Sequence, residues 1–450
     1  MSSGRRFDPR TRTRHRAWLI RARVDRWWRR LLFIIGGSIV GAVAAGLAIA
    51  AEAAQEGFFQ VHHWNRWVGF ALTPLGFAAC VYVARRWFPN SQGSGIPQAI
   101  AAHRLTGTEK RAALVSLRIA IGKIALTLFG LLCGASAGRE GPTVQIGASI
   151  MFSLGRWTRR HQAGLIVGGA SAGVAAAFNT PLAGIMFGIE ELTRSFERHT
   201  SALIVSTVVA AGFTAIALLG NYTYFGSSSA SLHGSSTALI VLACGIVGGL
   251  SGGLFSRIVL AAAHGFRGRV GGFVRSQPVA FAVLCGLGVA ICDLLSGPSS
   301  VHGTGYREVS AALGGSQPLA VQYGTLKFIA TTLTSISTIP GGIFSPSLAI
   351  GAGIGANVAQ LFSGVDVGAV MLVGMVAYLA GVVQAPITAF VIVTEMSDRH
   401  LMVIPLMVAA LIGHAASRLI CNEGIYHALA RGLLRTDGNA AGTAAARSAR

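Results

Sequence analysis

An Arg–Glu pair stands between glycines in a long apolar region, within the stretch Gly138-Arg139-Glu140-Gly141-Pro142. Charged side chains are costly inside a membrane, so such a pair marks a candidate functional site. Pro142 suits the first turn of a helix, where backbone N–H groups have no partner within the helix. The aligned peptide dipoles add about half a positive charge at that end. The stretch therefore predicts an anion site at a helix start, with the backbone of Gly138, Arg139 and Gly141 along the anion path.

The same arrangement of glycines before a proline occurs three times in the chain. The three stretches are "GSGIP" at 93–97, "GREGP" at 138–142 and "GGIFSP" at 341–346. One such motif alone is more simply explained by helix packing or a turn. Three converging helix starts, in contrast, can offset the hydration that an anion loses and still leave binding weak enough for release. The pattern favours a transported anion over a static charge pair.

The composition requires these helix starts to lie in a membrane. Of the 450 residues, 52% are hydrophobic and only 12% are charged, whereas soluble domains carry about 25% charged residues. Apolar tracts such as 31–55 and 201–219 have the length needed to span a bilayer. The 59 glycines allow close helix packing and broken helices, which are tolerated only inside protein or along a cavity. We predict an all-α polytopic membrane protein with tilted and broken helices.

The charge distribution predicts the orientation of the chain. Residues 1–30 hold eleven arginines, while the loop 220–236 has no Lys, Arg, Asp or Glu. Basic residues concentrate on the cytoplasmic side of membrane proteins, so both termini are expected in the cytoplasm and the loop outside. The basic segment and the net charge of +21 are expected to favour anionic lipid, and we predict no nucleic-acid partner. The six cysteines lack the spacing of a metal site, and none is predicted.

An internal repeat relates the two halves of the chain. Two pairs of similar segments carry it: "PTVQIGASI" (142–150) with "PSLAIGAGI" (346–354), and "PLAGIMFGIE" (181–190) with "PITAFVIVTE" (386–395). The prolines that open the two segments are 39 residues apart in the first half and 40 in the second. In duplicated transporters the site lies near the membrane midplane, where broken helices from both halves meet.

The repeat predicts the organisation of the whole chain. The expected parts are a basic cytoplasmic segment 1–30, a first transmembrane repeat 31–219, an external linker 220–236, a second transmembrane repeat 237–436 and a short cytoplasmic tail 437–450.

The chain resembles the CLC family of chloride channels and proton/chloride exchangers over about residues 31–436. The resemblance is carried by the sequence and order of three stretches: "GSGIP", "GREGPTVQIG" and "GGIFSPSLAIG". The resemblance implies two inverted-topology repeats and a homodimer with one pore per subunit, embedded in the lipid bilayer of the cell inner membrane. It implies a transporter and no enzyme, with chloride and protons as substrates and no cofactor. The tail is too short for the paired nucleotide-binding domains of many relatives.

The resemblance also implies residue roles. Ser94 and Tyr426 are expected to coordinate chloride through their hydroxyls, and Ile343 and Phe344 through backbone N–H groups. Glu140 resembles the external gate, whose carboxylate competes with chloride for a positive helix end. When protonated, the carboxyl loses that attraction and can swing away.

Two adjacent acids, Glu190 and Glu191, decide between an exchanger and a channel. Neighbours on a helix point about 100° apart, so the two are expected to face different surroundings. Glu190 matches Glu395 in the repeat, which favours a role in the shared scaffold, whereas Glu191 aligns with Met396. By resemblance, Glu191 is the internal proton-transfer acid of exchangers. We therefore predict proton-coupled antiport, with a passive voltage- or pH-gated chloride channel as the alternative.

Other functions are disfavoured by the residues present. A membrane hydrolase would show a Ser/His dyad or an HExxH helix, and the apolar tracts contain neither. By resemblance, Ser94 disfavours fluoride-specific and nitrate-preferring transport. One departure from the family is that Gln98, Ala99 and Ile100 follow "GSGIP" where acids are frequent, so proton delivery is expected to use a different route or to be less efficient.

Overall fold

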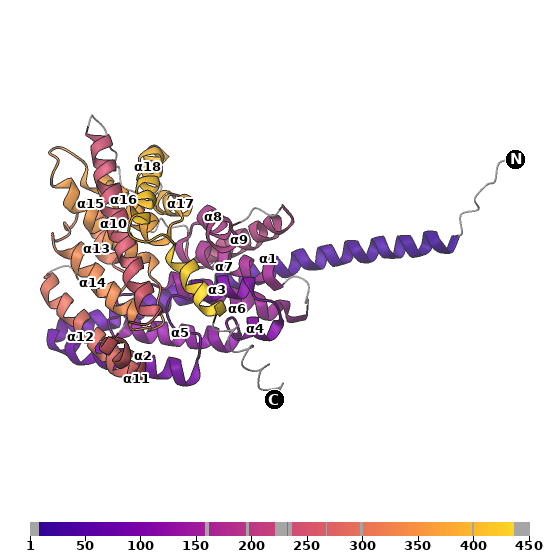
Figure 1. Cartoon of the computed structure of the whole chain (residues 1–450). Coiled ribbons are helices and arrows are strands. Elements are labelled where there is room, and N and C mark those ends of the chain that lie inside the picture. Colours follow the sequence, from indigo (N-terminus) through magenta and orange to yellow (C-terminus); the bar gives the residue numbers. More distant parts are fainter. Residues whose placement is uncertain are drawn as a thin grey trace.

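A computed structural model shows an almost entirely helical protein (Figure 1). It describes residues 9–157, 162–194, 198–220, 232, 236–266, 268–297, 300–397 and 400–435. Within these ranges there is no β-strand, and a single isolated bridge pairs Gly138 with Gly342. The prediction of an all-α fold is confirmed. Most of the loop 220–236, the start of the basic segment 1–30 and the tail 437–450 lie outside the described residues.

The elements of the first half follow one another through short connections. They are α1 (Pro9–Trp64), η1 (Arg66–Val68), α2 (Gly69–Trp87), α3 (Ile96–Arg104), α4 (Thr108–Ala112), α5 (Leu117–Leu132), α6 (Glu140–Leu154), η2 (Gly155–Trp157), α7 (Gln162–Phe178), α8 (Pro181–Phe187), the π-helical turn η4 (Gly188–Thr193) and α9 (Arg198–Leu219).

The second half repeats this pattern of long and short helices. It comprises α10 (Thr237–Ala263), α11 (Gly268–Ser276), α12 (Pro278–Ser296), α13 (Tyr306–Leu313), α14 (Tyr323–Ile336), α15 (Phe344–Ala359), α16 (Val367–Val383), α17 (Pro386–Ser397), η5 (His400–Met402), α18 (Val403–Arg418) and a last helical stretch 425–435.

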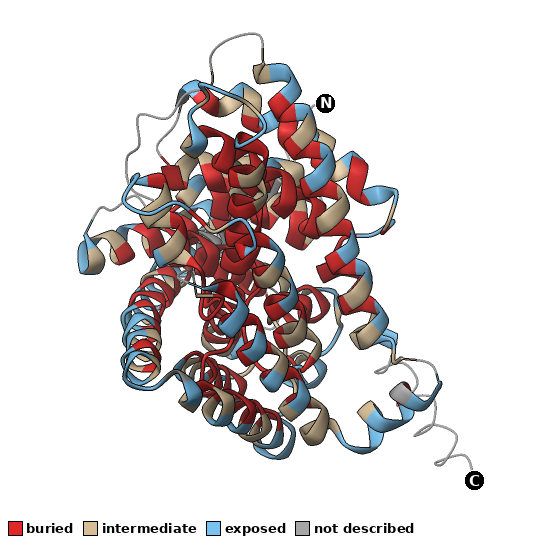
Figure 2. Ribbon diagram, turned by 90° about the vertical axis from the view of Figure 1, so that its left-hand side faces the viewer, coloured by how far each residue is buried: buried red, intermediate tan, exposed pale blue. Residues whose placement is uncertain are grey.

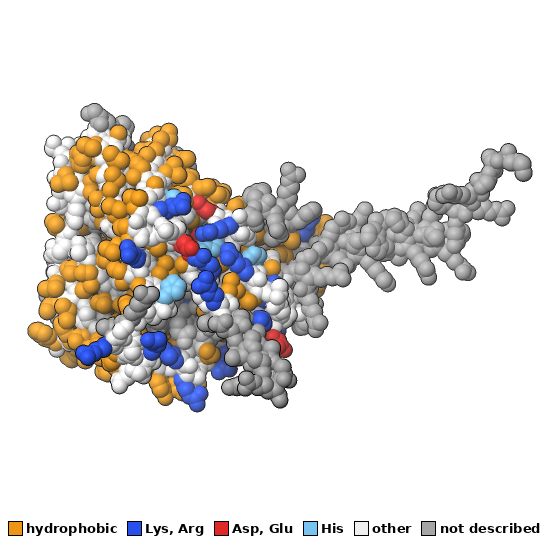
Figure 3. Space-filling model, in the orientation of Figure 1, with side chains coloured by type: hydrophobic (Ala, Val, Ile, Leu, Met, Phe, Trp, Pro, Cys, Tyr) orange, Lys and Arg blue, Asp and Glu red, His pale blue; other side chains and the backbone are white. Residues whose placement is uncertain are grey.

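The exterior fits a lipid environment. Five described helical segments are long and apolar enough to cross a membrane: Arg30–Trp64, Thr108–Leu132, Ala202–Leu219, Thr237–Ala263 and Pro278–Ser296. Large apolar side chains are exposed on the surface, for example Phe213 at 76% and Leu401 at 86%. On the face in Figure 3, Lys and Arg side chains gather in the middle, with hydrophobic side chains to the left and above. The chain is a multi-pass membrane protein.

Helix α1 is one continuous helix across the expected boundary at residue 30. Its N-terminal part projects away from the helical body, toward the end marked N in Figure 1. Residues 9–30 of the basic segment therefore form one helix with the first membrane span; the proline of 9–64 stands at the start of the helix, where proline is tolerated.

The interior is formed by helices that are buried on nearly all sides, as the red ribbon in Figure 2 shows. Helices α15 and α16 pack closely because glycines remove the side chain at their contact. A Cβ atom on Gly351 would lie 2.5 Å from the carbonyl oxygen of Gly374. Gly147, which matches Gly351 in the repeat, meets the Gly169 carbonyl between α6 and α7 in the same way. The repeat therefore specifies the same close helix packing twice.

The two halves also clamp each other through a reciprocal pair of carboxylates. Glu395 on α17 accepts hydrogen bonds from the backbone N–H groups of Leu182 and Ala183 at the start of α8, at 3.0 and 2.7 Å. Glu190 accepts from Ile387 and Thr388 at the start of α17, at 3.1 and 2.6 Å. Each carboxylate satisfies N–H groups that have no partner within their own helix. This geometry agrees with the scaffold role expected for Glu190.

The clamp yields a first prediction. Replacing Glu395 with Ala removes the acceptor for two N–H groups and should lower the free energy of unfolding by about 1–2 kcal/mol. Unfolding of the purified protein by sodium dodecyl sulfate measures the loss. Glu109, an exposed acid in the first turn of α4, provides the control variant Glu109→Ala. Equal stabilities for the two variants would contradict the clamp.

Candidate functional site

The three glycine-rich stretches meet at one point between the halves. Gly138 and Gly342 exchange both backbone hydrogen bonds, N to O, at 2.7 Å each. The neighbouring Gly341 N–H donates to the carbonyl oxygen of Gly93 at 3.1 Å. Stretches that lie far apart in the sequence are thus joined directly through their backbones. The starts of α6 and α15 are brought face to face by this pairing.

A buried lysine holds the loop before α3 in place. Lys123 on α5 has no exposed surface. Its ammonium group donates to the carbonyl oxygens of Ser91 and Gly93, at 2.8 and 2.5 Å. A buried charge is tolerated only when its donors are satisfied, and here backbone carbonyls serve. Sequence reasoning missed this residue, although a lysine within an apolar tract was a visible signal.

The second half carries a matching lysine and a matching loop. Lys327 on α14 donates to the carbonyl oxygens of Val301 and Gly303, both at 2.8 Å. Lys327 precedes Gly342 by 15 residues, just as Lys123 precedes Gly138. The loops agree too, since "GSG" at 93–95 and "GTG" at 303–305 both place their glycines at positive φ. This extends the repeat beyond the segments that the sequence comparison found.

Close contact of the loops explains why Gly141 lacks a side chain. A Cβ atom there would collide with the Ser94 hydroxyl and lie 3.1 Å from the Cα of Gly342. Gly95 has φ +98°, which side chains rarely adopt, and a Cβ atom there would lie 3.1 Å from the Gly141 carbonyl oxygen. The glycines therefore permit three backbones and the Ser94 hydroxyl to share one small volume.

Helices α6 and α15 both begin in this volume without a side chain that caps them. Glu140 is the first residue of α6 and only 1% exposed, and Arg139 precedes it as the N-cap. Ile343 is the N-cap of α15 and Phe344 its first residue. Neither N-cap side chain bonds the helix start. Glu140 and Phe344 thus occupy equivalent places in the two halves, and only the first half carries a charge there.

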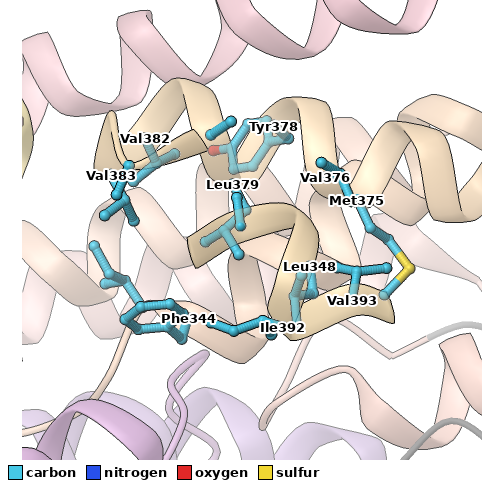
Figure 4. Close-up of a cluster of buried hydrophobic side chains, with 14 of the residues drawn as sticks. Phe344, Leu348, Met375, Val376, Tyr378, Leu379, Val382, Val383, Ile392 and Val393 are labelled. Carbon is cyan, nitrogen blue, oxygen red and sulfur yellow. The ribbon is translucent and has the colours of Figure 1, made fainter. Parts of the chain in front are cut away.

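Tyr426, from the last helical stretch, completes the site. Its ring stacks on Phe344 with centroids 5.9 Å apart, and Phe344 lies at the edge of the buried hydrophobic cluster in Figure 4. The Tyr426 hydroxyl lies near the Ser94 hydroxyl and within electrostatic range of Glu140 and Glu191. Both hydroxyl oxygens are buried, and apart from each other neither has a hydrogen-bond partner in the described part of the protein. Two buried hydroxyl donors pointing into one volume suit an anion.

Arg139 lies beside the site and faces α1. Its guanidinium group donates to the carbonyl oxygen of Ala48 at 2.6 Å and to the carboxylate of Glu52 at 3.1 Å. The side chain of Glu52 is 66% exposed, so this ion pair reaches the surface. The contacts indicate that the Arg139 side chain fixes the start of α6 against α1, while its backbone lies along the site.

The adjacent acids Glu190 and Glu191 face different surroundings. Both belong to the π-helical turn η4, a geometry found frequently at functional sites. Glu190 reaches the start of α17, whereas Glu191 is 1% exposed and points toward the last helical stretch. There, Nε2 of His427 lies 2.7 Å from the Glu191 carbonyl oxygen and 3.6 Å from its Oε1. Sequence reasoning missed His427, which had no repeat or motif to mark it.

A cavity of about 840 Å³ opens beside this pair. Its charged and titratable lining residues are Arg104, Glu190, Arg194, His414, Arg418, Glu423, His427 and Arg431. We call it the arginine-lined cavity. Among the described residues no group of His, Cys, Asp or Glu has metal-site geometry.

Comparison with known proteins identifies the family to which this sequence is similar. The profile of the family described as "Voltage gated chloride channel" matches residues 75–418. A protein of Cronobacter sakazakii named "H(+)/Cl(-) exchange transporter ClcA" is 30% identical, over 95% of this chain and 96% of its own length. The protein of the same name from Citrobacter koseri is 27% identical, over 93% and 92%.

Solved structures agree on the fold. A structure described as "a slow cyanobacterial Cl-/H+ antiporter" superposes with a TM-score of 0.77 at 26% identity, over 91% of this chain and 99% of the other. One described as "a CLC-type fluoride/proton antiporter" reaches a TM-score of 0.74 at 22% identity, over 89% and 97%. At that lower identity the likeness concerns the fold alone.

The two buried hydroxyls yield a second prediction. Ser94→Ala combined with Tyr426→Phe removes two donors that face the volume between the helix starts. Halide affinity, measured by calorimetry on the purified protein, should fall about 100-fold or more, since hydrogen bonds to charged groups contribute about 1.5–3 kcal/mol each and two are lost. Tyr378 is a matched control, because its hydroxyl is also buried without a hydrogen bond but lies on α16. Unchanged affinity in the double variant would remove both hydroxyls from the site.

Proposed function

Since this chain belongs to the voltage gated chloride channel family, we propose that it is a proton-coupled chloride antiporter. The observation that carries the proposal is the placement of two buried acids, Glu140 and Glu191, within electrostatic range of the buried Tyr426 hydroxyl. A conduit for anions alone needs the helix starts and hydroxyls. Titratable groups beside them add a means of binding protons.

The anion is held by partial charges in this proposal. Chloride lies between the starts of α6 and α15, near the backbone N–H groups of Ile343 and Phe344, and accepts from the hydroxyls of Ser94 and Tyr426. Helix dipoles attract an anion without a full positive charge beside it, so release stays fast. The arginine-lined cavity supplies chloride to this site from one side.

Glu140 acts as the external gate. As a carboxylate at the start of α6, it is attracted to the same positive helix end as chloride and takes the place of an anion. Protonation removes that attraction, so the side chain leaves and chloride enters. Exchange of one anion for the other at a single site couples chloride movement to proton binding.

Glu191 serves as the internal proton-transfer acid. It is buried next to Tyr426, whereas Glu190 is held at the start of α17 by hydrogen bonds to backbone N–H groups. These different surroundings support the assignment of proton transfer to Glu191 and of a scaffold role to Glu190. We assign the Glu191 side of the site to the cytoplasm. The arginine-lined cavity lies on the Glu191 side, and basic residues concentrate on the cytoplasmic side of membrane proteins.

We further propose a homodimer in the inner membrane, with one pore per subunit and both termini in the cytoplasm. In this proposal each subunit transports alone through the site formed by its own residues. The exposed apolar side chains of Leu182 on α8, Phe213 on α9 and Ile404 on α18 offer a contact face; α8 contacts α9, and α17 contacts both α8 and α18. The mass of the detergent-solubilised protein, corrected for detergent, tests this state.

Liposomes that contain the purified protein test the function. An imposed chloride gradient should drive protons uphill in the opposite direction, followed by a pH electrode. If chloride flows down its gradient and the pH remains constant, the protein is a passive chloride channel and antiport is rejected.

A third prediction isolates the internal acid. Glu191→Gln keeps the size and polarity of the side chain but cannot bind a proton. Chloride flux should persist at a reduced rate, while proton transport driven by chloride should fall below detection. Proton pumping at the native rate by this variant would reject the assignment, and Glu190→Gln would then be the next variant to assay.

A fourth prediction concerns the gate. Glu140→Ala removes the only carboxylate at the starts of α6 and α15, so chloride should pass without moving protons. The dependence of chloride flux on external pH should flatten as well, because the titrating group is gone. Chloride efflux measured between about pH 4 and 8 checks the pH dependence, and a pH electrode checks the loss of proton movement. Glu52→Ala, which changes the partner of Arg139, is the control. Uphill proton transport by Glu140→Ala would place the gate elsewhere.

A further inference from the structure

The proposed proton acid is separated from the arginine-lined cavity. Glu191 is 1% exposed and does not line that cavity. Its neighbour Glu190 does line it, but the Glu190 carboxylate is bound to the N–H groups at the start of α17. A proton that moves between the cavity and Glu191 therefore needs a carrier that touches both.

His427 touches both. Its ring lines the cavity, and its Nε2 lies 3.6 Å from Oε1 of Glu191 and 2.7 Å from the Glu191 carbonyl oxygen. The other nitrogen, Nδ1, lies 3.2 Å from the guanidinium group of Arg104, which also lines the cavity. The two nitrogens of one imidazole thus point in different directions, one to the acid and one to the cavity side.

The neighbours determine the tautomer of the ring. A guanidinium group can only donate, so Nδ1 of His427 accepts from Arg104. Nε2 then carries the hydrogen and donates to the Glu191 carbonyl oxygen. The Glu191 carboxylate oxygen Oε1 lies 3.6 Å from the same nitrogen. We propose that His427 relays protons between the arginine-lined cavity and Glu191; this rests on the role proposed above for Glu191.

The transfer balances without any further reactant. As the exposed Arg104 turns aside, a hydronium ion in the cavity gives a proton to Nδ1 and becomes water, while Nε2 gives its proton to the Glu191 carboxylate. The products are the neutral Nδ1–H tautomer and a neutral carboxylic acid. A half-turn of the ring about its Cβ–Cγ bond then exchanges the two nitrogens, so that the protonated nitrogen faces Glu191 and the bare nitrogen faces the cavity. The same steps in reverse carry a proton into the cavity.

The charges around His427 favour passing a proton on over holding it on the ring as an imidazolium. Those that face it or line the same cavity are Arg104 from α3, Glu190, Glu191 and Arg194 from η4 and its end, His414 and Arg418 from α18, and the ion-paired Glu423 and Arg431. Positive charge predominates, so a charged imidazolium is disfavoured. A relay in such surroundings passes a proton on quickly, and the same charges draw chloride into the cavity.

The test variant is His427→Gln, which keeps a donor for the Glu191 carbonyl and an acceptor for Arg104 but cannot titrate. In liposomes, proton uptake driven by a chloride gradient should fall at least about tenfold. Chloride flux through Glu140→Ala/His427→Gln should persist, since the anion site holds no part of His427. His414→Gln is the matched control, because His414 lines the same cavity on α18 without a contact to Glu191, and its proton uptake should remain native.

Rescue by imidazole separates a relay from a packing role. His427→Ala opens space continuous with the cavity, so about 10–50 mM imidazole should restore proton uptake without changing chloride flux. Native proton transport by His427→Gln, or by His427→Ala without imidazole, would overturn the proposed relay. A hydrogen-bonded side chain or water would then be enough to carry the proton to Glu191. Failure of the unmodified protein to move protons would instead reject the antiport that this inference assumes.

Discussion

Backbone pairing between Gly138 and Gly342 is the contact on which the rest of the site depends. Two hydrogen bonds of 2.7 Å join the halves at the point where α6 and α15 begin. Positive helix ends repel one another, so holding two of them together requires a rigid frame or a bound negative charge. The frame consists of the glycine contacts, which admit no Cβ atom, and the buried Lys123 and Lys327, which fasten the flanking loops. The negative charge is supplied by Glu140 or by an anion.

The buried charges of this protein fall into two groups by the partners they have. Lys123, Lys327, Glu190 and Glu395 bind backbone groups at loops and helix starts, and these contacts hold the halves together. Glu191 instead lies beside a tyrosine hydroxyl and a histidine, both of which can exchange protons. A group bound to several fixed dipoles resists changes of charge, whereas one beside titratable neighbours can change it. In the proposed mechanism the same residue type thus serves structure at position 190 and proton transfer at position 191.

Position along the π-helical turn η4 explains how adjacent acids reach such different places. Glu190 extends to α17 of the other half, and Glu191 turns inward toward Tyr426 and His427. In the proposed mechanism the proton and anion routes share the region around Tyr426 and separate between there and the arginine-lined cavity. In the proposed mechanism the arginine-lined cavity supplies chloride directly and protons through His427, so one cavity feeds two chemically distinct paths.

The sequence by itself determined the all-α membrane fold, the repeat and the three glycine-rich helix starts, because hydrophobic length and glycine–proline order are local properties of the chain. It also separated Glu190 from Glu191, since the repeat keeps only the former. Only the tertiary structure decided which helix starts meet, that Glu190 and Glu395 clamp opposite halves, and that Lys123 and Lys327 fasten matching loops. His427 shows the reason most clearly: it lies 236 residues from Glu191, and no local pattern encodes a contact over that distance.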